Sequence, residues 1–261
     1  MKFNKLIAYP IWPDAIQVQW EIDNDQLTGV YTFEVELFID SKTTLYKSSV
    51  ILNKYYYRIP YTPLLYIEIR NALKICVSCT PPYTNARRGI EPFEQIITLY
   101  HGLDKHEMNK ALDITRRETM LFERKIGMLS EIYKRKTFGE VCDKCVDQFT
   151  HTCTNSHCTA CYGTGYVGGY YEPEELWADI VEVPVDKQAS DGGTTEEKTA
   201  KIRLSNQVLL NKRDLVLDKI NSNMWEVSAE PNLIKYRSFP VSQECSAFML
   251  APKDIGYGLI K

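Results

Sequence analysis

The sequence predicts a mainly β protein with one long α-helix and a small metal-binding insertion. Three observations carry this prediction: hydrophobic and polar residues alternate near both ends, a helical repeat fills the middle, and two Cys-x-x-Cys pairs follow it. We expect four consecutive parts: a β-sandwich over 1–102, a long amphipathic helix over 103–137, a zinc-ribbon-like module over 138–175, and a C-terminal β module over 176–261.

The composition is that of a folded protein with no basic excess. Of the 261 residues, 44% are hydrophobic and 25% are charged, and a length near 150 residues per domain suggests roughly two domains. The formal net charge is 31 − 34 = −3, which makes nucleic-acid binding unlikely. Nine basic and six acidic residues lie within 104–136, whereas 172–197 holds nine acidic residues and one lysine. This asymmetry indicates contacts with other proteins, or simply two solvated surfaces.

The first ten residues lack the apolar core of a secretory signal. The sequence also has no run of about 18 apolar residues, the length needed to span a bilayer. We therefore expect no membrane contact and a cytosol-like, reducing compartment. Five of the eight cysteines fall between Cys142 and Cys161. In a reducing compartment such clustering indicates metal binding rather than disulfide bonds.

The first hundred residues have the pattern of strands buried on one face. Apolar residues alternate with polar ones over 16–21 and 31–40, with turn-forming residues between them. The spacing of the strands is typical of a small antiparallel sandwich. Further strands are predicted at 44–52, 55–59, 64–70, 74–79 and 94–100.

Three of these segments resemble those of a fibronectin type III or immunoglobulin-like domain. They are Gln17–Trp20, which ends in tryptophan, Tyr31–Glu36 and Leu65–Ile69. The resemblance implies a spacer or docking module, because such domains mostly serve those roles.

Cys76 and Cys79 form a further Cys-x-x-Cys pair inside this module. Residues three apart on a strand point to opposite faces, so a shared metal or a disulfide is disfavoured. We interpret both as packing residues. A metal or redox role would require the loop at Pro81-Pro82 to begin earlier than we predict.

A long amphipathic helix is predicted from Asp104 to about Lys136. Apolar residues and threonines recur at steps of three and four without any proline, and Asp104 with Glu107 forms a capping box. About 32 residues would give a rod of about 48 Å, which suits either a spacer or a core helix lying across one domain. Gly127 would weaken or bend it.

The C-terminal part is predicted to be a second β module. A polar, glycine-bearing loop is expected at 189–197, and Asn221-Ser222-Asn223 is expected to form a hairpin turn. Strands are predicted at 176–185, 201–210, 215–220, 224–229, 236–241 and 246–250.

The most specific chemical signal is a pair of cysteine knuckles with the spacing C-x2-C-x12-C-x2-C. Four thiolates fill a closed tetrahedral zinc site and leave no position for water, so a structural Zn2+ is expected. Gly163 and Gly165 allow the backbone to turn back after the second knuckle. The predicted ligands are Cys142, Cys145, Cys158 and Cys161.

Other interpretations of the cysteines remain open at this point. Cys153, His151 or His157 lie between the knuckles and can replace one of the four ligands, with Cys153 preferred because zinc favours thiolates. The pairs can instead serve thiol-redox chemistry. The run from Cys158 to Gly165 also resembles the repeat of DnaJ-type chaperones, which carry four such repeats where this chain has one.

A second resemblance covers more of the chain. The helix, Tyr133–Asp147 and Cys158–Pro173, in that order, resemble tailed-bacteriophage virion proteins of the neck or tail-connector type. Leu209–Val216, Met224–Val227 and Asp254–Tyr257 are similar to the β modules of phage connector and tail-completion subunits. The resemblance implies a virion protein, assembled in the host cytoplasm, that forms a ring-like homo-oligomer and binds neighbouring connector, portal or tail proteins.

The sequence offers no catalytic or cofactor-binding motif, and we predict that the chain is not an enzyme. Gly163–Gly168 spells G-x-G-x-x-G, but it follows a metal knuckle rather than a strand. The four histidines, at 101, 106, 151 and 157, have no obvious nucleophile or carboxylate partner in the sequence. The main alternative is a zinc-ribbon nucleic-acid-binding protein, and a weaker one is a thiol-redox or chaperone protein.

Overall fold

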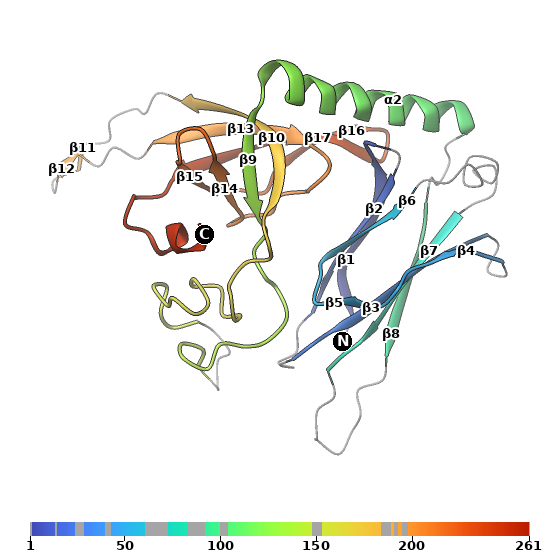
Figure 1. Ribbon diagram of the computed structural model, residues 1–261, viewed down its shortest axis with the longest axis horizontal. Helices are drawn as coiled ribbons and strands as arrows, with labels where there is room; N and C mark the ends of the chain where they lie inside the picture. Colours follow the sequence, from blue (N-terminus) through green and yellow to red (C-terminus); the bar gives the residue numbers. More distant parts are fainter. Residues whose placement is uncertain are drawn as a thin grey trace. The chain divides into compact units, whose positions relative to one another are not determined.

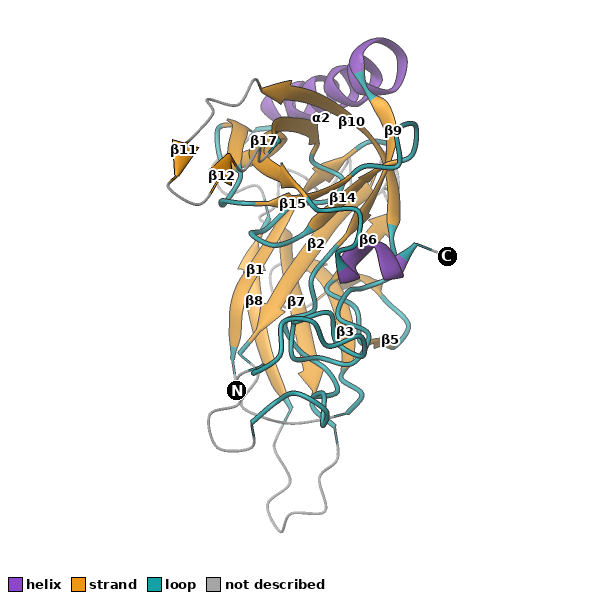
Figure 2. Cartoon of the chain, turned by 90° about the vertical axis from the view of Figure 1, so that its left-hand side faces the viewer, coloured by secondary structure: helices purple, strands orange, loops and turns teal. Residues whose placement is uncertain are grey.

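Strands dominate the computed structural model of the chain (Figure 2). The chain divides into two compact units, one formed by residues 1–113 and 136–169 and the other by 114–135 and 170–261. These units differ from the four consecutive segments expected from the sequence, because the chain leaves each unit and returns to it. The structure describes residues 2–13, 15–23, 29–39, 43–60, 73–82, 92–99, 104–147, 153–183, 189–190, 193–194 and 198–260.

The first unit contains two antiparallel sheets (Figure 1). The sheets contact each other through aromatic rings, with centroids 5.0 Å apart for Trp20 and Phe33 and 5.1 Å apart for Phe3 and Phe93. One sheet has the order β1 (Phe3–Ile11), β2 (Ala15–Ile22) and β6 (Tyr56–Pro60). The other has the order β4 (Thr43–Lys47), β3 (Thr32–Ile39), β7 (Leu73–Thr80) and β8 (Phe93–Thr98), with β5 (Ile51–Leu52) paired to β3.

Most strands predicted for this unit are present. The predicted strand 44–52 is instead two strands, β4 and β5, separated at Ser48. The Ser48 hydroxyl accepts a hydrogen bond from the Val35 N–H at 2.9 Å, and its own N–H donates to the Val35 carbonyl. Strand β1 was not predicted. Its middle residues are all partly exposed, so apolar and polar residues do not alternate along it. The predicted strand 64–70 and most of the first turn lie outside the described residues.

Cys76 and Cys79 both lie in β7 and are buried. Burial raises the pKa of Cys76 to about 11 and that of Cys79 to about 12. Both thiols are therefore protonated at neutral pH, as expected of packing residues.

The predicted helix 104–136 is wrong in its last third. Helix α2 (Lys105–Leu121) continues into a π-helical turn, η1 (Phe122–Ile126), and the next residues form strand β9 (Met128–Tyr133). The start agrees with the prediction, since the Glu107 N–H donates to Asp104 Oδ1 at 2.8 Å. Within the described segment 104–136, the helical residues end at Ile126 and therefore do not form the expected rod of about 48 Å.

Gly127 is where the helix ends. Its N–H donates to the Phe122 carbonyl at 2.9 Å, and its backbone is extended, with φ −85° and ψ 156°. A Cβ at this position would lie 2.5 Å from the Phe122 oxygen and 3.2 Å from Trp177 Cβ. Only glycine fits this approach without a backbone shift.

We therefore expect Gly127→Ala to lower the free energy of unfolding by about 1–3 kcal/mol through overpacking. Thermal and urea unfolding followed by circular dichroism measure the change. Lys125→Ala, an exposed substitution two residues earlier, should stay within about 0.5 kcal/mol of the unaltered chain. Equal stability of the two variants would contradict this account of the helix end.

The second unit is a closed antiparallel β-barrel of six strands with one strand added outside the ring. The pairing of β13 with β17 closes the barrel, and the interior is filled by apolar side chains such as Ile202, Val216 and Trp225. Around the barrel the order is β9, β14 (Leu215–Asp218), β15 (Met224–Val227), β17 (Phe239–Met249), β13 (Thr199–Ser205) and β10 (Glu174–Val183), and β16 (Asn232–Tyr236) pairs with β17.

Four of the six C-terminal strand predictions match β10, β13, β14 and β15 and differ from them at the ends. Residues 236–241 and 246–250 fall into β16 and the long β17 rather than into two separate short strands. The hairpin turn at Asn221-Ser222-Asn223 is confirmed, because the Asp218 N–H donates to the Asn223 carbonyl at 2.9 Å. Part of the loop predicted at 189–197 is a short hairpin, β11 (Ala189–Ser190) with β12 (Gly193–Thr194).

A second apolar cluster covers one outer face of the barrel. Tyr133, Leu215 and Met224 belong to it, and the 3-10 helix η2 (Ile255–Leu259) packs against them through Tyr257. The Tyr257 hydroxyl accepts a hydrogen bond from the Met224 N–H at 3.1 Å. Among the described residues, no helix has the length and apolar character needed to cross a membrane.

A buried ion pair joins the end of β9 to the segment before β14. Lys134 Nζ lies 2.5 Å from Asp214 Oδ2 and 2.7 Å from the Leu209 carbonyl oxygen. Asp214 also accepts backbone hydrogen bonds from Arg135 at 2.8 Å and Asn211 at 2.6 Å. Burial raises the pKa of the Asp214 carboxyl, and Lys134 and the two N–H groups oppose that rise.

Candidate metal centre

The cysteine module is an insertion between two neighbouring strands of the barrel, β9 and β10. At the exit from the barrel, Arg135 and Tyr170 form an antiparallel bridge. One residue further, the Lys136 N–H donates to the Gly169 carbonyl at 3.0 Å. The two ends of the 136–169 segment therefore lie side by side, and the segment leaves and re-enters as a closed loop.

The two knuckles have the same turn. The Val146 N–H donates to the Cys142 carbonyl at 3.2 Å, and the Tyr162 N–H donates to the Cys158 carbonyl at 2.7 Å. In each knuckle a backbone N–H two residues later, from Lys144 in one and Ala160 in the other, is directed at the first sulfur. Such N–H groups stabilise thiolates, the form in which cysteine binds metals.

Backbone pairing holds the first knuckle beside the strand-like segment that follows the second. Val141 and Tyr166 form an antiparallel bridge, and the Cys142 N–H donates to the Gly165 carbonyl at 2.9 Å. The Val167 N–H donates to the Glu140 carbonyl at 2.8 Å. The positions of the knuckles are thus set by hydrogen bonds as well as by any ion between them.

The structure brings together all four sulfurs singled out in the sequence, and together they could hold a metal ion. The Sγ atoms of Cys142, Cys145, Cys158 and Cys161 all lie within 4.8 Å of one another. Cys142 and Cys158 Sγ are 3.8 Å apart, and Cys145 and Cys161 Sγ are 3.1 Å apart. A tetrahedron with metal–sulfur bonds of about 2.3 Å has edges of about 3.8 Å, so the donor set fits such a site.

The environment of the sulfurs is largely dry. None of the four residues is more than 7% exposed. Burial raises the pKa of Cys142 and of Cys145, whereas the hydrogen bond from the Ala160 N–H lowers the pKa of Cys158 to about 7. Burial of several thiolates requires a compensating positive charge, which a divalent cation supplies.

Glycines allow the tight return of the chain behind the second knuckle. Gly163 has φ +71°, and a Cβ there would lie 2.9 Å from the Ser156 carbonyl oxygen. Gly169 has φ +64°, and a Cβ there would lie 2.6 Å from the carbonyl oxygen of Cys161. Gly168 also has a positive φ, +79°, but the only atom within 4 Å of its Cβ would be Lys136 Nζ, at 3.0 Å, the far end of a flexible side chain.

Gly169→Ala is therefore expected to weaken metal binding at the four cysteines about tenfold, since changes around metal ligands typically cost 10–100-fold in affinity. Gly168→Ala is the matched control, because it carries the same positive-φ strain without the contact to Cys161. Competition with a chromogenic zinc chelator gives both affinities. Equal affinities for the two variants would show that this contact does not position Cys161.

Cys153, an alternative ligand considered from the sequence, lies beside the cluster. Its Sγ lies 3.3 Å from Cys145 Sγ and 4.0 Å from Cys161 Sγ, and its side chain is partly exposed. His157 is exposed, with its N–H donating to Asn155 Oδ1 at 2.9 Å, and His151 lies outside the described residues.

An aromatic contact that the sequence did not reveal packs the cysteine module against a sheet of its own unit. Phe138 is 1% exposed, and its ring centroid is 5.5 Å from that of Tyr31 and 5.6 Å from that of Phe33. Both partners lie about a hundred residues earlier in the chain, so no local pattern identifies them.

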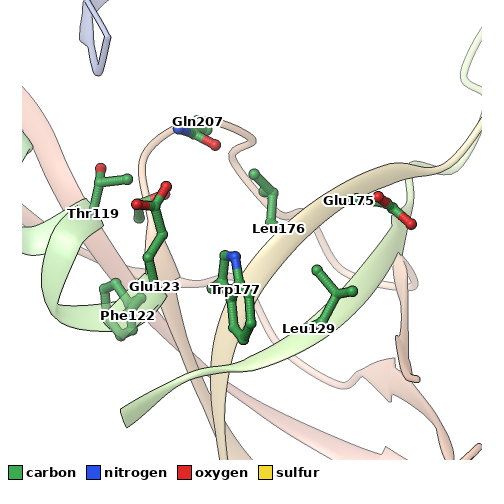
Figure 3. Close-up of a pocket in the computed structure, with 9 residues that line it drawn as sticks. Thr119, Phe122, Glu123, Leu129, Glu175, Leu176, Trp177 and Gln207 are labelled. Atoms are coloured by element: carbon green, nitrogen blue, oxygen red, sulfur yellow. The ribbon is translucent and has the colours of Figure 1, made fainter. Parts of the chain in front are cut away.

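A separate pocket of about 210 Å3 lies in the second unit (Figure 3). Glu123 projects into it beside Trp177, while Glu175 lies at the other end and pairs with Lys219 Nζ at 2.5 Å. The lining brings no histidine or cysteine near these carboxylates. Its residues are Thr119, Phe122, Glu123, Leu129, Glu175, Leu176, Trp177, Ser205 and Gln207.

Comparison with known proteins identifies no family and no relative for this chain. No protein-family model matches the chain, and no curated protein matches it by sequence.

Proposed function

We propose that the chain is a structural, non-enzymatic subunit of a bacteriophage virion, in the neck or head–tail connector region, stabilised by one zinc ion. The observation that carries the proposal is the closed set of four buried sulfurs inserted between adjacent barrel strands. Four protein ligands leave no coordination position for a substrate or a catalytic water, which is the arrangement of structural zinc sites.

The donor set favours zinc or iron, and we propose zinc because the two knuckles resemble those of zinc ribbons. Soft thiolate ligands in a tetrahedral S4 set select Zn2+ or iron over Mg2+ and Ca2+. Each knuckle supplies two sulfurs from one tight turn, as in zinc ribbons.

The proposed role of the ion is to fold and stiffen residues 136–169. The buried apolar cluster around the knuckles consists of the four cysteines, with Val146, Cys153 and Ala160 packed against them. Such a small cluster supplies little hydrophobic stabilisation, so metal binding contributes most of the folding free energy of the segment. Zinc would thereby hold in place the backbone that carries Phe138 against Tyr31 and Phe33.

We further propose that the two-sheet part of the first unit is an immunoglobulin-like or fibronectin type III module serving as a spacer or docking surface. Its strand order supports this assignment: β1, β2 and β6 correspond to strands A, B and E, and β3, β7 and β8 correspond to strands C, F and G. Strand β4 beside β3 takes the place of C′.

The virion location rests on the resemblance of residues 133–147 and 158–173 to phage neck and connector proteins. Mass spectrometry of purified phage particles tests it, and the expected result is peptides of this chain at a constant copy number per particle. Native mass spectrometry or negative-stain microscopy of the purified chain should show a ring-like homo-oligomer. Absence of the chain from particles would overturn the proposed location.

Nucleic-acid binding is the second candidate, favoured by the exposed cations along α2 and η1. These are Lys110, Arg116, Arg117, Arg124 and Lys125. Fluorescence anisotropy with duplex DNA at about 150 mM salt distinguishes the candidates, since binding through phosphates weakens steeply with salt. Salt-dependent binding at this ionic strength would favour the second candidate, and its absence with ring formation would favour the first.

A further inference from the structure

We propose that Cys153 is a site of oxidation by hydroperoxides, and that its oxidised sulfur forms a disulfide with Cys145, which removes Cys145 from the metal-ligand set and releases the ion. This inference rests on the zinc site proposed above and adds a chemical sensitivity to it.

The geometry already pairs these two sulfurs. Cys153 Sγ lies 3.3 Å from Cys145 Sγ, nearer than its 4.0 Å distance to Cys161 Sγ. Backbone contacts keep the segments adjacent, because Cys153 forms a bridge with Val146 and the Thr154 N–H donates to the Cys145 carbonyl at 2.8 Å. A disulfide bond of about 2.05 Å then requires a side-chain movement of little more than 1 Å.

Accessibility makes Cys153 the first sulfur that an oxidant meets. The four proposed ligands are at most 7% exposed, whereas Cys153 is partly exposed. Its thiol also donates to the Asn155 carbonyl oxygen at 3.2 Å, in a contact that is exposed to solvent. Redox-sensitive cysteines typically combine access to solvent with a second cysteine close enough to form a disulfide.

The reaction balances with hydrogen peroxide as the oxidant. The Cys153 sulfur attacks one peroxide oxygen, the O–O bond breaks, and a sulfenic acid and one water form. The Cys145 sulfur then attacks the sulfenic sulfur, the S–S bond forms, and the S–O bond breaks with loss of hydroxide, which takes a proton to become the second water. The Cys153 thiol and the Cys145 thiolate together lose two electrons, the peroxide gains them, and the proton taken up by the hydroxide comes from solvent.

Loss of Cys145 leaves Cys142, Cys158 and Cys161 as ligands. Three thiolates no longer close the tetrahedron, so the affinity for zinc falls and residues 136–169 lose their stabilising ion. Reduction of the disulfide restores all four ligands, and the release is therefore reversible.

The experiment uses the full, zinc-loaded chain treated with hydrogen peroxide. A chromogenic chelator follows zinc release, and peptide mapping without reductant identifies the disulfide. We expect release with a Cys145–Cys153 disulfide and recovery after addition of dithiothreitol and zinc. Cys153→Ser should release zinc about tenfold more slowly, because its remaining cluster thiols are buried. Cys76→Ser, which removes a buried cysteine outside the cluster, should behave like the unaltered chain.

Distinct outcomes separate the two proposals. A purified chain that folds without any zinc overturns the zinc site itself, and the oxidation proposal with it. Three results overturn only the oxidation proposal. The zinc-loaded chain resists peroxide, it forms a different disulfide, or it and the Cys153→Ser variant release zinc at the same rate. If Cys153→Ser binds no zinc before oxidation, Cys153 is a ligand, and the proposed role is wrong. Zinc content and melting of each variant are therefore measured first.

Discussion

Replacing Cys158 with serine is expected to lower the zinc content from about one ion per chain to nearly none, because a closed structural site needs all four thiolates. Structural zinc sites in small peptides contribute about 10–16 kcal/mol of binding free energy, so losing the ion removes the main source of stability for residues 136–169. The Phe138 contact with Tyr31 and Phe33 belongs to the same segment and is expected to loosen with it. Elemental analysis and hydrogen exchange of residues 136–169 measure the two effects.

Cys76→Ser is the matched control for this variant. Cys76 is also buried, at 7% exposure, but it lies in β7 outside the sulfur cluster. The control should keep its zinc and its protection from exchange in residues 136–169. Unchanged zinc content and unchanged protection in Cys158→Ser would show that Cys158 is not a ligand.

Asp214→Ala is expected to lower the free energy of unfolding of the barrel unit by about 3–5 kcal/mol, the usual cost of breaking a buried ion pair. The substitution leaves the Lys134 ammonium, which is 3% exposed, without its carboxylate. It also leaves the N–H groups of Arg135 and Asn211 without their acceptor. Urea unfolding followed by circular dichroism measures the loss.

Two further variants locate the origin of that loss. Asp179→Ala removes a carboxylate of the same barrel that faces Arg203 at 3.8 Å near the surface, and it should cost about 0–1 kcal/mol. The double variant Lys134→Met with Asp214→Leu removes both buried charges and should recover part of the stability. A loss of less than 1 kcal/mol in Asp214→Ala would contradict a structural role for the pair.

The predictable parts of the fold are those that local patterns specify. Strict alternation over 31–40 predicted β3, and the capping box at Asp104 and Glu107 predicted the start of α2. The same reasoning misassigned Met128–Tyr133, because apolar residues at Leu129, Ile132 and Tyr133 satisfy a helical spacing as well as a buried strand. The decisive feature was the close approach of Gly127 to the Phe122 carbonyl, a local backbone contact that hydrophobic periodicity does not report.

Closure of the barrel was equally beyond local reasoning. The pairing of β13 with β17 joins residues about forty positions apart, and that of β9 with β14 joins residues about eighty apart. Strand β9 pairs with β10 on one edge and with β14 on the other. Both partners follow the 136–169 insertion in the sequence. Hydrophobic alternation specifies a strand but not which strands pair with it.

In the candidate site too, local sequence patterns predicted some features, whereas long-range contacts determined others. The convergence of the four cysteines was predictable, because two-residue spacers within each pair make tight knuckles that present sulfurs to one point. Their surroundings were not, since Phe138 packs on residues about a hundred positions away. The structure also buries Lys134 against Asp214, eighty residues later, and no local sequence pattern specifies that pairing.

X-ray absorption at the zinc edge of the purified chain tests the central proposal most directly. We expect a single zinc species bound by about four sulfur atoms at about 2.3 Å, with no nitrogen or oxygen ligand. A folded chain that contains no metal, or a metal coordinated by nitrogen or oxygen atoms, would contradict the proposal that these cysteines form a structural zinc site.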